Sequence, residues 1–166
     1  MANAESNEVH NLHIMGFEHL PTPDELRQEF SLQGKALDTV REGHRAVKGI
    51  LDRVDPRLIV VVGPCSIHNP DEAMHYARLL KPLADELSNE LLIVMRVYFE
   101  KPRTSVGWEG LIYDPSLDGS HRIDQGLRTG RKLMLEIAEL GLPIAIEALD
   151  LISPQYLQDL VSWTAI

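Results

Sequence analysis

Three short apolar segments alternate along the chain with longer segments whose apolar residues recur at helical spacing. The short segments, at 57–63, 91–99 and 142–149, are rich in Val, Ile and Leu and are too short for buried helices, so they predict β-strands. The first of them has the pattern of a strand that is buried on both faces. Strand–helix–strand order implies right-handed crossovers that place the strands parallel to one another. The sequence therefore predicts an α/β fold built on a parallel sheet.

The connecting segments predict helices at 69–89, 122–141 and 153–163. Asn69 can cap the first of these helices, and Gly141 is expected to end the second. Pro82 lies inside the first helix and is expected to kink it or to divide it in two. Each predicted strand is thus followed by a helix that can cover the sheet.

The first part of the chain predicts an extension that precedes the sheet. Residues 1–20 are polar, lack a sustained period and have the character of an arm. A short helix is expected from Pro23, because proline suits the first helical position. A second amphipathic helix is expected from 37 to 52, with His44 at the edge of its apolar face. We therefore divide the chain into an extension and a sheet-forming region, 1–56 and 57–166.

The chain has 166 residues and a formal net charge of −9. A negative field of this size repels nucleic acid and anionic membranes, so neither is an expected partner. No apolar run approaches the roughly 20 residues of a membrane-spanning helix, and the N-terminal residues lack the pattern of a signal peptide. We therefore expect a cytoplasmic protein. An anionic metabolite would need a local cluster of Arg and Lys side chains.

Such a cluster of cations follows the second predicted strand. Arg96 lies near the end of the strand, and Lys101 and Arg103 enter a long loop beside the hydroxyl group of Thr104. Active sites of α/β barrels and open α/β sheets lie at the carboxyl ends of the strands. Arg binds phosphate or carboxylate groups with paired hydrogen bonds, and Lys adds a compact charge. These cations either bind anionic substrates or form solvated ion pairs with two carboxylates of the loop, Glu100 and Glu109.

Two further reactive side chains are expected at the same edge. Cys65, the only cysteine, follows the first strand and is a metal ligand, a nucleophile or, as its spacing favours, a small buried residue. His68 can complete a two-ligand clip, which is a weak signal without further ligands. Glu147, near the end of the third strand, can act as an acid or base, position a water, or pair with Arg96. The absence of a Gly-rich phosphate loop and of HExxH, CxxC and GxSxG motifs disfavours nucleotide chemistry.

Three stretches carry a resemblance to a known family, GPCSIHNP at 63–70, VMRVYFEKPRTSVGWEGLIYDP at 94–115 and SPQYLQDLVSWTAI at 153–166. They resemble the type I, metal-dependent 3-deoxy-D-arabino-heptulosonate 7-phosphate (DAHP) synthases. A sister family that makes the eight-carbon sugar acid phosphate also begins its barrel with Gly-Pro-Cys. That family carries an Asn-Arg-Ser type loop where this chain has KPRTSVGW, so the resemblance to the sister family is weaker.

The resemblance implies a (β/α)8 TIM barrel, of which this chain forms roughly the first three to four βα units after an N-terminal helical extension. It implies the aldol-type condensation of phosphoenolpyruvate with erythrose 4-phosphate to DAHP and phosphate, at the start of the shikimate pathway. It also implies a divalent metal cofactor (Mn, Fe, Co or Zn), with Cys65 as the first ligand. The extension at 1–56 resembles the family's region for subunit contacts and for feedback inhibition by an aromatic amino acid, so we expect a homo-oligomer.

Residue by residue, the resemblance implies roles for the cation cluster. Arg96 and Lys101 match phosphoenolpyruvate contacts, and Arg103 and Thr104 match residues that hold the phosphate of erythrose 4-phosphate. We take Lys101, Arg96 and Glu147 as candidate catalytic residues. The condensation brings two anions together and polarises an aldehyde oxygen, which requires a cluster of cations and a Lewis acid.

The chain stops where the resemblance places the fourth barrel strand, whereas a full barrel takes about 250 residues. The family's other metal ligands, a His, a Glu and an Asp, would lie beyond Ile166. We therefore expect the chain alone to be inactive. The alternative is an inactive remnant or a regulatory fragment that associates with a full-length homologue. A lyase that forms a Schiff base on Lys101 is less favoured, because Lys101 lies among loop cations and not in an apolar strand.

Overall fold

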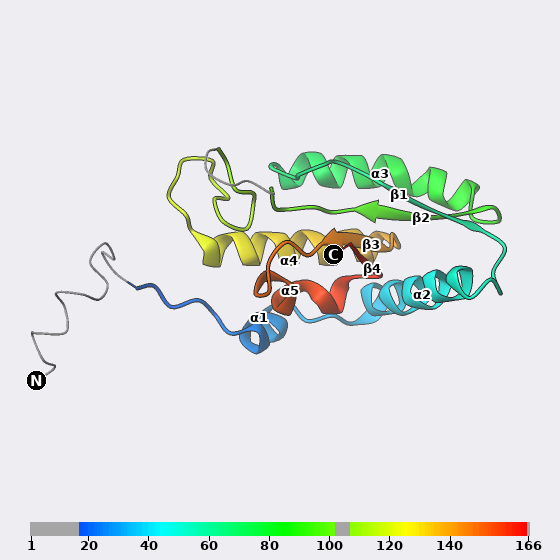
Figure 1. Cartoon of the computed structure of the whole chain (residues 1–166), viewed down its shortest axis with the longest axis horizontal. Helices are drawn as coiled ribbons and strands as arrows, with labels where there is room; N and C mark the ends of the chain where they lie inside the picture. Colours follow the sequence, from blue (N-terminus) through cyan, green and yellow to red (C-terminus); the bar gives the residue numbers. More distant parts are fainter. Residues whose placement is uncertain (1–16, 102–106, 166) are drawn as a thin grey trace, which may run out of the picture.

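The computed structural model describes residues 17–101 and 107–165 (Figure 1). It is built around one parallel sheet of four strands, in the spatial order β1-β2-β3-β4. Spatial order follows chain order, as it does when each crossover adds the next strand of a (β/α) barrel. The predicted α/β class and partial barrel are confirmed. The strands are β1 (Leu58–Val62), β2 (Leu91–Arg96), β3 (Ile144–Glu147) and β4 (Trp163–Ala165).

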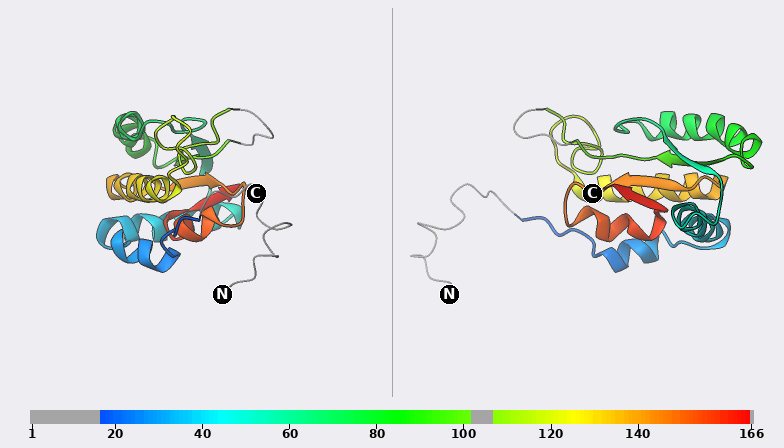
Figure 2. Two further views of the ribbon diagram at one scale, coloured as in Figure 1. Left: turned by 90° about the vertical axis from the view of Figure 1, so that its left-hand side faces the viewer. Right: turned by 45° about the vertical axis from the view of Figure 1, so that its right-hand side comes forward.

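Helices α3 and α4 form the first two crossovers and pack side by side on one face of the sheet (Figure 2). Asn69 caps α3 by accepting hydrogen bonds from the N–H groups of Asp71 and Glu72. Gly141 ends α4 in the left-handed conformation, with φ of 90°. The helices are α1 (Pro23–Glu29), α2 (Gly34–Leu51), α3 (Pro70–Glu86), α4 (Ile123–Leu140) and α5 (Ser153–Leu157), and a 3₁₀ turn, η2 (Gln158–Leu160), follows α5.

Strand β2 lies between two apolar clusters, because successive side chains of a strand point to opposite faces. Met95 belongs to the larger cluster, which contains the buried residues of α3 and α4. Val94 packs on the other face with Ala145 of β3 and Val47 of α2. Val40, in the first half of α2, belongs to the larger cluster. Helix α2 therefore contacts apolar side chains on both sides of the sheet.

Strand β1 is more exposed than the sequence predicts. Leu58 is 67% exposed and Val61 is 39% exposed, so the expectation of burial on both faces is wrong. The reason is that β1 pairs with β2 along one edge, and no other described strand covers its second edge. Val60 and Val62 still pack against the larger cluster. β1 thus contacts both apolar clusters, through Val60 and Val62 on one face and Ile59 on the other, while Leu58 and Val61 stay open.

The segment 153–163, predicted as one helix, has three parts in the structure. Helix α5 ends at Leu157, the turn η2 follows to Leu160, and Trp163 begins β4. Trp163 pairs with Ala145 of β3, and the chain must leave the helix early to reach that register. Pairing in the sheet therefore overrides the helical pattern of the sequence.

Helices α2 and α3 follow the prediction with small differences. Helix α3 continues through the exposed Pro82 and is not divided. Helix α2 begins at Gly34, ahead of the expected start. His44 is exposed on α2, where its Nε2 contacts the carbonyl oxygen of Val161. No helix in the described ranges is both long and apolar enough to cross a membrane.

A fully buried arginine joins the N-terminal helices to the rest of the chain. Arg131 of α4 is 0% exposed. Its Nε donates to the carbonyl oxygen of Phe30, just after α1, and its Nη1 donates to that of Tyr156 in α5. Nη1 and Nη2 also bind the carboxylate of Asp159 at 2.7 and 2.8 Å. One guanidinium group therefore connects α1, α4 and the α5–η2 segment.

Replacing Arg131 by alanine should lower the free energy of unfolding by about 3–5 kcal/mol, because it leaves the Asp159 carboxylate and two carbonyl groups without their donor. Arg128→Ala on the same helix is the matched control. Its guanidinium pairs with Glu29 and Asp124 at the surface, so its loss should cost about 0–1 kcal/mol. Urea unfolding followed by circular dichroism measures both variants. An equal loss of unfolding free energy in the two variants would contradict the conclusion that Arg131 stabilises the chain by connecting three of its segments.

Candidate active site

The side chains singled out from the sequence lie at the carboxyl ends of three neighbouring strands. Cys65 follows β1, Arg96 is the last residue of β2, and Glu147 is the last residue of β3. The three strands are parallel and adjacent, so their carboxyl ends form one edge of the sheet. This is the edge at which barrel enzymes build their active sites.

Arg96 is anchored on the turn that follows β1. Its Nε donates to the carbonyl oxygens of Gly63 and Pro64 at 3.2 and 3.0 Å, and its Nη2 donates to that of Gly63 at 2.6 Å. The guanidinium carbon lies 5.4 Å from the centre of the Tyr98 ring, which is a cation–π distance. No residue in 17–101 or 107–165 accepts a hydrogen bond from Nη1, so this nitrogen can donate to an anion.

Gly63 allows the turn after β1 to lie against the end of β2. A Cβ atom at this position would lie 2.5 Å from the carbonyl oxygen of Arg96 and 3.2 Å from the Arg96 Cβ. The contact of 2.5 Å with a backbone oxygen is too short for a Cβ atom unless the backbone shifts. The glycine therefore sets how closely Cys65 and its turn approach the end of β2.

Cys65 is exposed, so the interpretation of this residue as a small buried side chain is wrong. An exposed thiol can become a thiolate and ligate a metal ion. The predicted partner, His68, instead has its Nε2 at 3.8 Å from a carboxylate oxygen of Glu72. Among the residues that the structure describes, no group of three or more His, Cys, Asp and Glu is placed to hold a metal ion. A metal ion bound at Cys65 would need ligands from elsewhere.

The loop after β2 has a defined backbone around Lys101. Glu100 and Gly110 form an antiparallel bridge, and the N–H group of Lys101 donates to the carbonyl oxygen of Glu109 at 3.0 Å. Lys101 is half-buried at the start of this loop. Two predicted substrate contacts lie outside the described residues, Arg103 and Thr104.

The carboxylates near the cations have other partners. Glu109 faces a histidine ring of the same loop at 3.8 Å, and Glu100 is buried. Within the described ranges, neither residue forms an ion pair with Arg96 or Lys101, and Glu147 forms none with Arg96. The alternative of loop cations paired with Glu100 and Glu109 finds no support in this part of the chain.

A buried carboxyl group lies beside this edge, and the sequence analysis did not identify it as a site residue. Glu100 is 9% exposed, and its Oε1 accepts a hydrogen bond from the Ser153 hydroxyl group at 2.5 Å. Burial, opposed by the Ser153 hydrogen bond and assisted by Asp150 and Glu147, raises the pKa of Glu100 to about 7. One feature of the sequence could have identified Glu100 as a site residue. It directly follows the predicted strand at 91–99, at the edge where the other site residues were expected.

Asp150 has the opposite electrostatic environment. Burial alone would raise the pKa of Asp150, but hydrogen bonds from the Tyr113 hydroxyl group at 2.7 Å and from the N–H groups of Ser153 and Ile152 hold it below its usual value. Burial and the bond to Asp150 raise the pKa of Tyr113. Adjacent carboxyl groups whose pKa values are pushed apart can divide their roles, and Glu100 holds its proton to a higher pH than Asp150 does.

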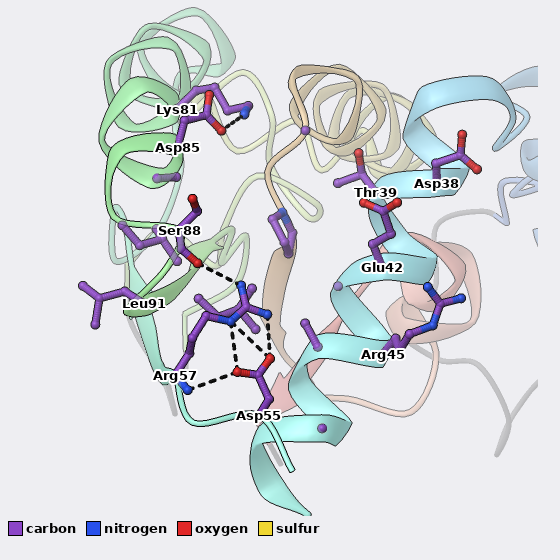
Figure 3. Close-up of a pocket in the computed structure, with 18 of the residues that line it drawn as sticks. Asp38, Thr39, Glu42, Arg45, Asp55, Arg57, Lys81, Asp85, Ser88 and Leu91 are labelled. Atoms are coloured by element: carbon purple, nitrogen blue, oxygen red, sulfur yellow. Dashed lines mark hydrogen bonds and ion pairs between the residues drawn. The ribbon is translucent and has the colours of Figure 1, made fainter. Parts of the chain in front are cut away.

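A pocket of about 840 Å³ lies at the other end of the sheet, between α2, α3 and the start of β2 (Figure 3). Two ion pairs form part of its lining, Arg57 with Asp55 and Lys81 with Asp85. Barrel enzymes carry out their chemistry at the carboxyl ends of the strands, and this pocket lies at the amino ends. It is therefore separate from the candidate active site.

Comparison with known proteins decides the family. The model of the DAHP synthetase I family matches residues 35–166. The chain belongs to this family. The Tyr-sensitive phospho-2-dehydro-3-deoxyheptonate aldolase of Escherichia coli (strain K12) is 51% identical to it over 158 residues. The Phe-sensitive aldolase of the same organism is 53% identical over 156 residues.

This member of the DAHP synthetase I family spans about half the length of the Escherichia coli relatives. The alignments cover 95% and 94% of this chain, but 44% and 45% of the Tyr-sensitive and Phe-sensitive proteins. The aldolase of Amycolatopsis methanolica is 48% identical, and its alignment covers 97% of this chain and 79% of that protein. A solved phospho-2-dehydro-3-deoxyheptonate aldolase from Francisella tularensis SCHU S4 superposes with a TM-score of 0.87 at 44% identity, covering 92% of this chain and 45% of that one.

Replacing Gly63 by alanine should lower the free energy of unfolding by about 1–3 kcal/mol, because the new methyl group overlaps the carbonyl oxygen of Arg96. The matched control is Gly49→Ala in α2, where the nearest atom is the Asp55 Cβ at 3.5 Å. That control should stabilise the chain by about 0.5–1 kcal/mol, because alanine favours a helix over glycine. Urea unfolding compares the two, and a neutral Gly63→Ala would contradict the close approach of the turn.

Proposed function

We propose that this chain provides the substrate-binding edge of a 3-deoxy-7-phosphoheptulonate (DAHP) synthase. The enzyme is a transferase that condenses phosphoenolpyruvate with erythrose 4-phosphate and releases phosphate, in the first step of the shikimate pathway. The observation that carries the proposal is that Arg96, Lys101 and the exposed Cys65 lie at the same edge of a parallel sheet. Membership of the DAHP synthetase I family supports it.

Arg96 and Lys101 are the proposed contacts of phosphoenolpyruvate and act in catalysis. Arg96 is held by carbonyl oxygens through Nε and Nη2, so its Nη1 can meet an anion without a rearrangement of the side chain. Lys101 adds a compact positive charge from a loop whose backbone is bridged. Together they offset the repulsion between two phosphorylated substrates and the charge of the departing phosphate.

Arg103 and Thr104 are the proposed contacts for the phosphate of erythrose 4-phosphate. They follow Lys101 directly in the same loop. A guanidinium group and a hydroxyl group together offer several donors to phosphate oxygens. Binding each substrate by its own anionic group orients the two reacting carbon atoms toward one another, which lowers the entropic part of the barrier.

Cys65 is the proposed first ligand of a divalent metal ion, Mn, Fe, Co or Zn. The thiol fits this role because it is exposed at the edge that carries the substrate-binding cations. Bound there, such an ion supplies the Lewis acid that polarises the aldehyde oxygen of erythrose 4-phosphate. The remaining ligands would come from outside the described residues.

Glu147 is the third proposed catalytic residue. It ends β3, is half-buried, and lies close enough to Glu100 to raise the pKa of that group. A carboxylate at the end of a barrel strand can hold a water molecule or accept a proton from it. We assign Glu147 to the water or proton that the condensation requires.

We propose that residues 1–56 serve subunit contacts in a homo-oligomer and inhibition by an aromatic amino acid. Relatives of this chain are named Tyr-sensitive, Phe-sensitive and Trp-sensitive. Within this extension, α1 is joined to the sheet-forming region through Arg131, which gives a physical connection between the two. A cytoplasmic location is part of the same proposal.

A chimera tests the metal site, with residues 1–166 followed by the remaining sequence of the Escherichia coli Tyr-sensitive relative. On titration with Co²⁺ it should develop the ultraviolet charge-transfer absorption of a cobalt–thiolate bond. Cys65→Ala should abolish that band because it removes the thiolate, and Ser66→Ala, at the next residue, should retain it. A band of unchanged strength in Cys65→Ala would contradict the assignment.

The reaction itself is tested by phosphate release from phosphoenolpyruvate with erythrose 4-phosphate and Mn²⁺. We expect the 166 residues alone to be inactive and the chimera to be active. In the chimera, Lys101→Met should lower kcat/KM by about 100-fold or more, because it removes a charge that meets the substrate. Lys132→Met, on the exposed side of α4, should leave kcat/KM unchanged. Turnover by the isolated chain at the level of the chimera would contradict the first expectation, and an active Lys101→Met would contradict the second.

A further inference from the structure

Glu100 lies where the loops after three strands meet. Its carbonyl oxygen accepts a hydrogen bond from the hydroxyl group of Ser66, in the turn after β1, at 3.1 Å. Its backbone is bridged to Gly110 in the loop after β2. Its carboxyl group accepts from Ser153, in the segment after β3, at 2.5 Å. One residue therefore connects the loops of β1, β2 and β3.

We propose that Glu100 is a positioning residue, whose carboxyl group connects the loop after β2 to the segment after β3 through Ser153 and so sets the place of Lys101. Lys101 is the next residue, and its N–H group is bonded to Glu109 in the same bridged part of the loop. The importance of Lys101 for phosphoenolpyruvate rests on the proposed function. The tie between the two loops does not depend on it.

The charged groups around Glu100 favour its neutral form. The carboxylate of Asp150 faces it and is itself held ionised by three hydrogen-bond donors. No cation in the described ranges forms an ion pair with Glu100. The titratable groups of this cluster are Asp150 and Glu147 on the side of β3, and Tyr113, Glu109 and His121 in the loop after β2.

Glu100 and Asp150 are neighbouring carboxyl groups, and a proton on one of them relieves the repulsion between them. Asp150 already accepts from the Tyr113 hydroxyl group and from two backbone N–H groups, which favour its ionised form, so Glu100 is the group that takes the proton. Protonated Glu100 accepts from Ser153 through Oε1 and places no second negative charge beside Asp150. Loss of that proton leaves two facing carboxylates at a buried position, and the contact becomes repulsive. The pKa of about 7 places this change in the neutral range.

Nuclear magnetic resonance on the 166-residue chain tests the tie directly. The amide shifts of Ser153 and Leu111 should follow one titration with a midpoint near pH 7, because a single proton links their two segments. In Glu100→Gln both shifts should stay flat, since the amide group does not ionise and can accept from Ser153 at every pH. His121→Gln is the control, because His121 lies in the same loop and faces Glu109 at 3.8 Å without contacting Glu100. It should leave the titration unchanged.

Two further measurements do not depend on the spectrum of one variant. Asp150→Asn removes the facing charge and should lower the midpoint of the titration. The stability of the wild type relative to Glu100→Gln should be greatest near pH 4.5 and below, and should be lost as the pH rises through about 7, because the folded-state pKa is raised from 4.5. Titration near pH 4.5 in the wild type, persistence of the titration in Glu100→Gln, or its loss in His121→Gln would overturn the tie.

The effect on Lys101 is measured in the active chimera through the KM for phosphoenolpyruvate. The ratio of KM in the wild type to KM in Glu100→Gln should rise about tenfold between about pH 6 and about pH 8, because only the protonated fraction holds Lys101 in place. The kcat at saturation should change equally in both. A flat ratio beside an intact titration would overturn the positioning of Lys101. An inactive chimera beside an intact titration would count against the proposed function and support the tie.

Discussion

The packing of β2 is the constraint on which the rest of the structure depends. This strand bonds to β1 along one edge and to β3 along the other, and its residues from Leu92 to Met95 are buried between two apolar clusters. A change of register would move each of these side chains to the wrong face. The carboxyl end of β2 is therefore a rigid reference point, and Arg96, Glu100 and Lys101 follow from it along the chain.

Two kinds of charged group meet at this edge, and their environments keep them from cancelling each other. Arg96 is anchored by carbonyl oxygens, which are neutral acceptors, so its positive charge remains available. Glu100 is buried beside the carboxylates of Asp150 and Glu147, which raises its pKa, and it forms no ion pair with a cation of the described ranges. In a chain with a net charge of −9, this arrangement leaves the charge of Arg96 unpaired by any carboxylate of the described ranges.

Local patterns predicted the segments that form strands and helices, because β-branched runs, helical periodicity, the Asn69 cap and the Gly141 stop involve residues that are close in the chain. The same patterns failed where a neighbour in space decides the outcome. β1 is exposed because described strands cover only one of its edges, and Trp163 leaves the helical segment because it pairs with Ala145. The exposure of Cys65 depends in the same way on how its turn lies against β2.

The sequence by itself determined the α/β class, the order of the elements, and the placement of the candidate site at one edge, since right-handed crossovers between parallel strands bring all their carboxyl ends to the same side. Only the tertiary structure decided the raised pKa of Glu100 and the burial of Arg131. Glu100 meets Ser153, 53 residues further on, and Arg131 meets Phe30, 101 residues earlier. Desolvation and hydrogen bonding act through space, so no pattern along the chain predicts which distant groups will share one buried position.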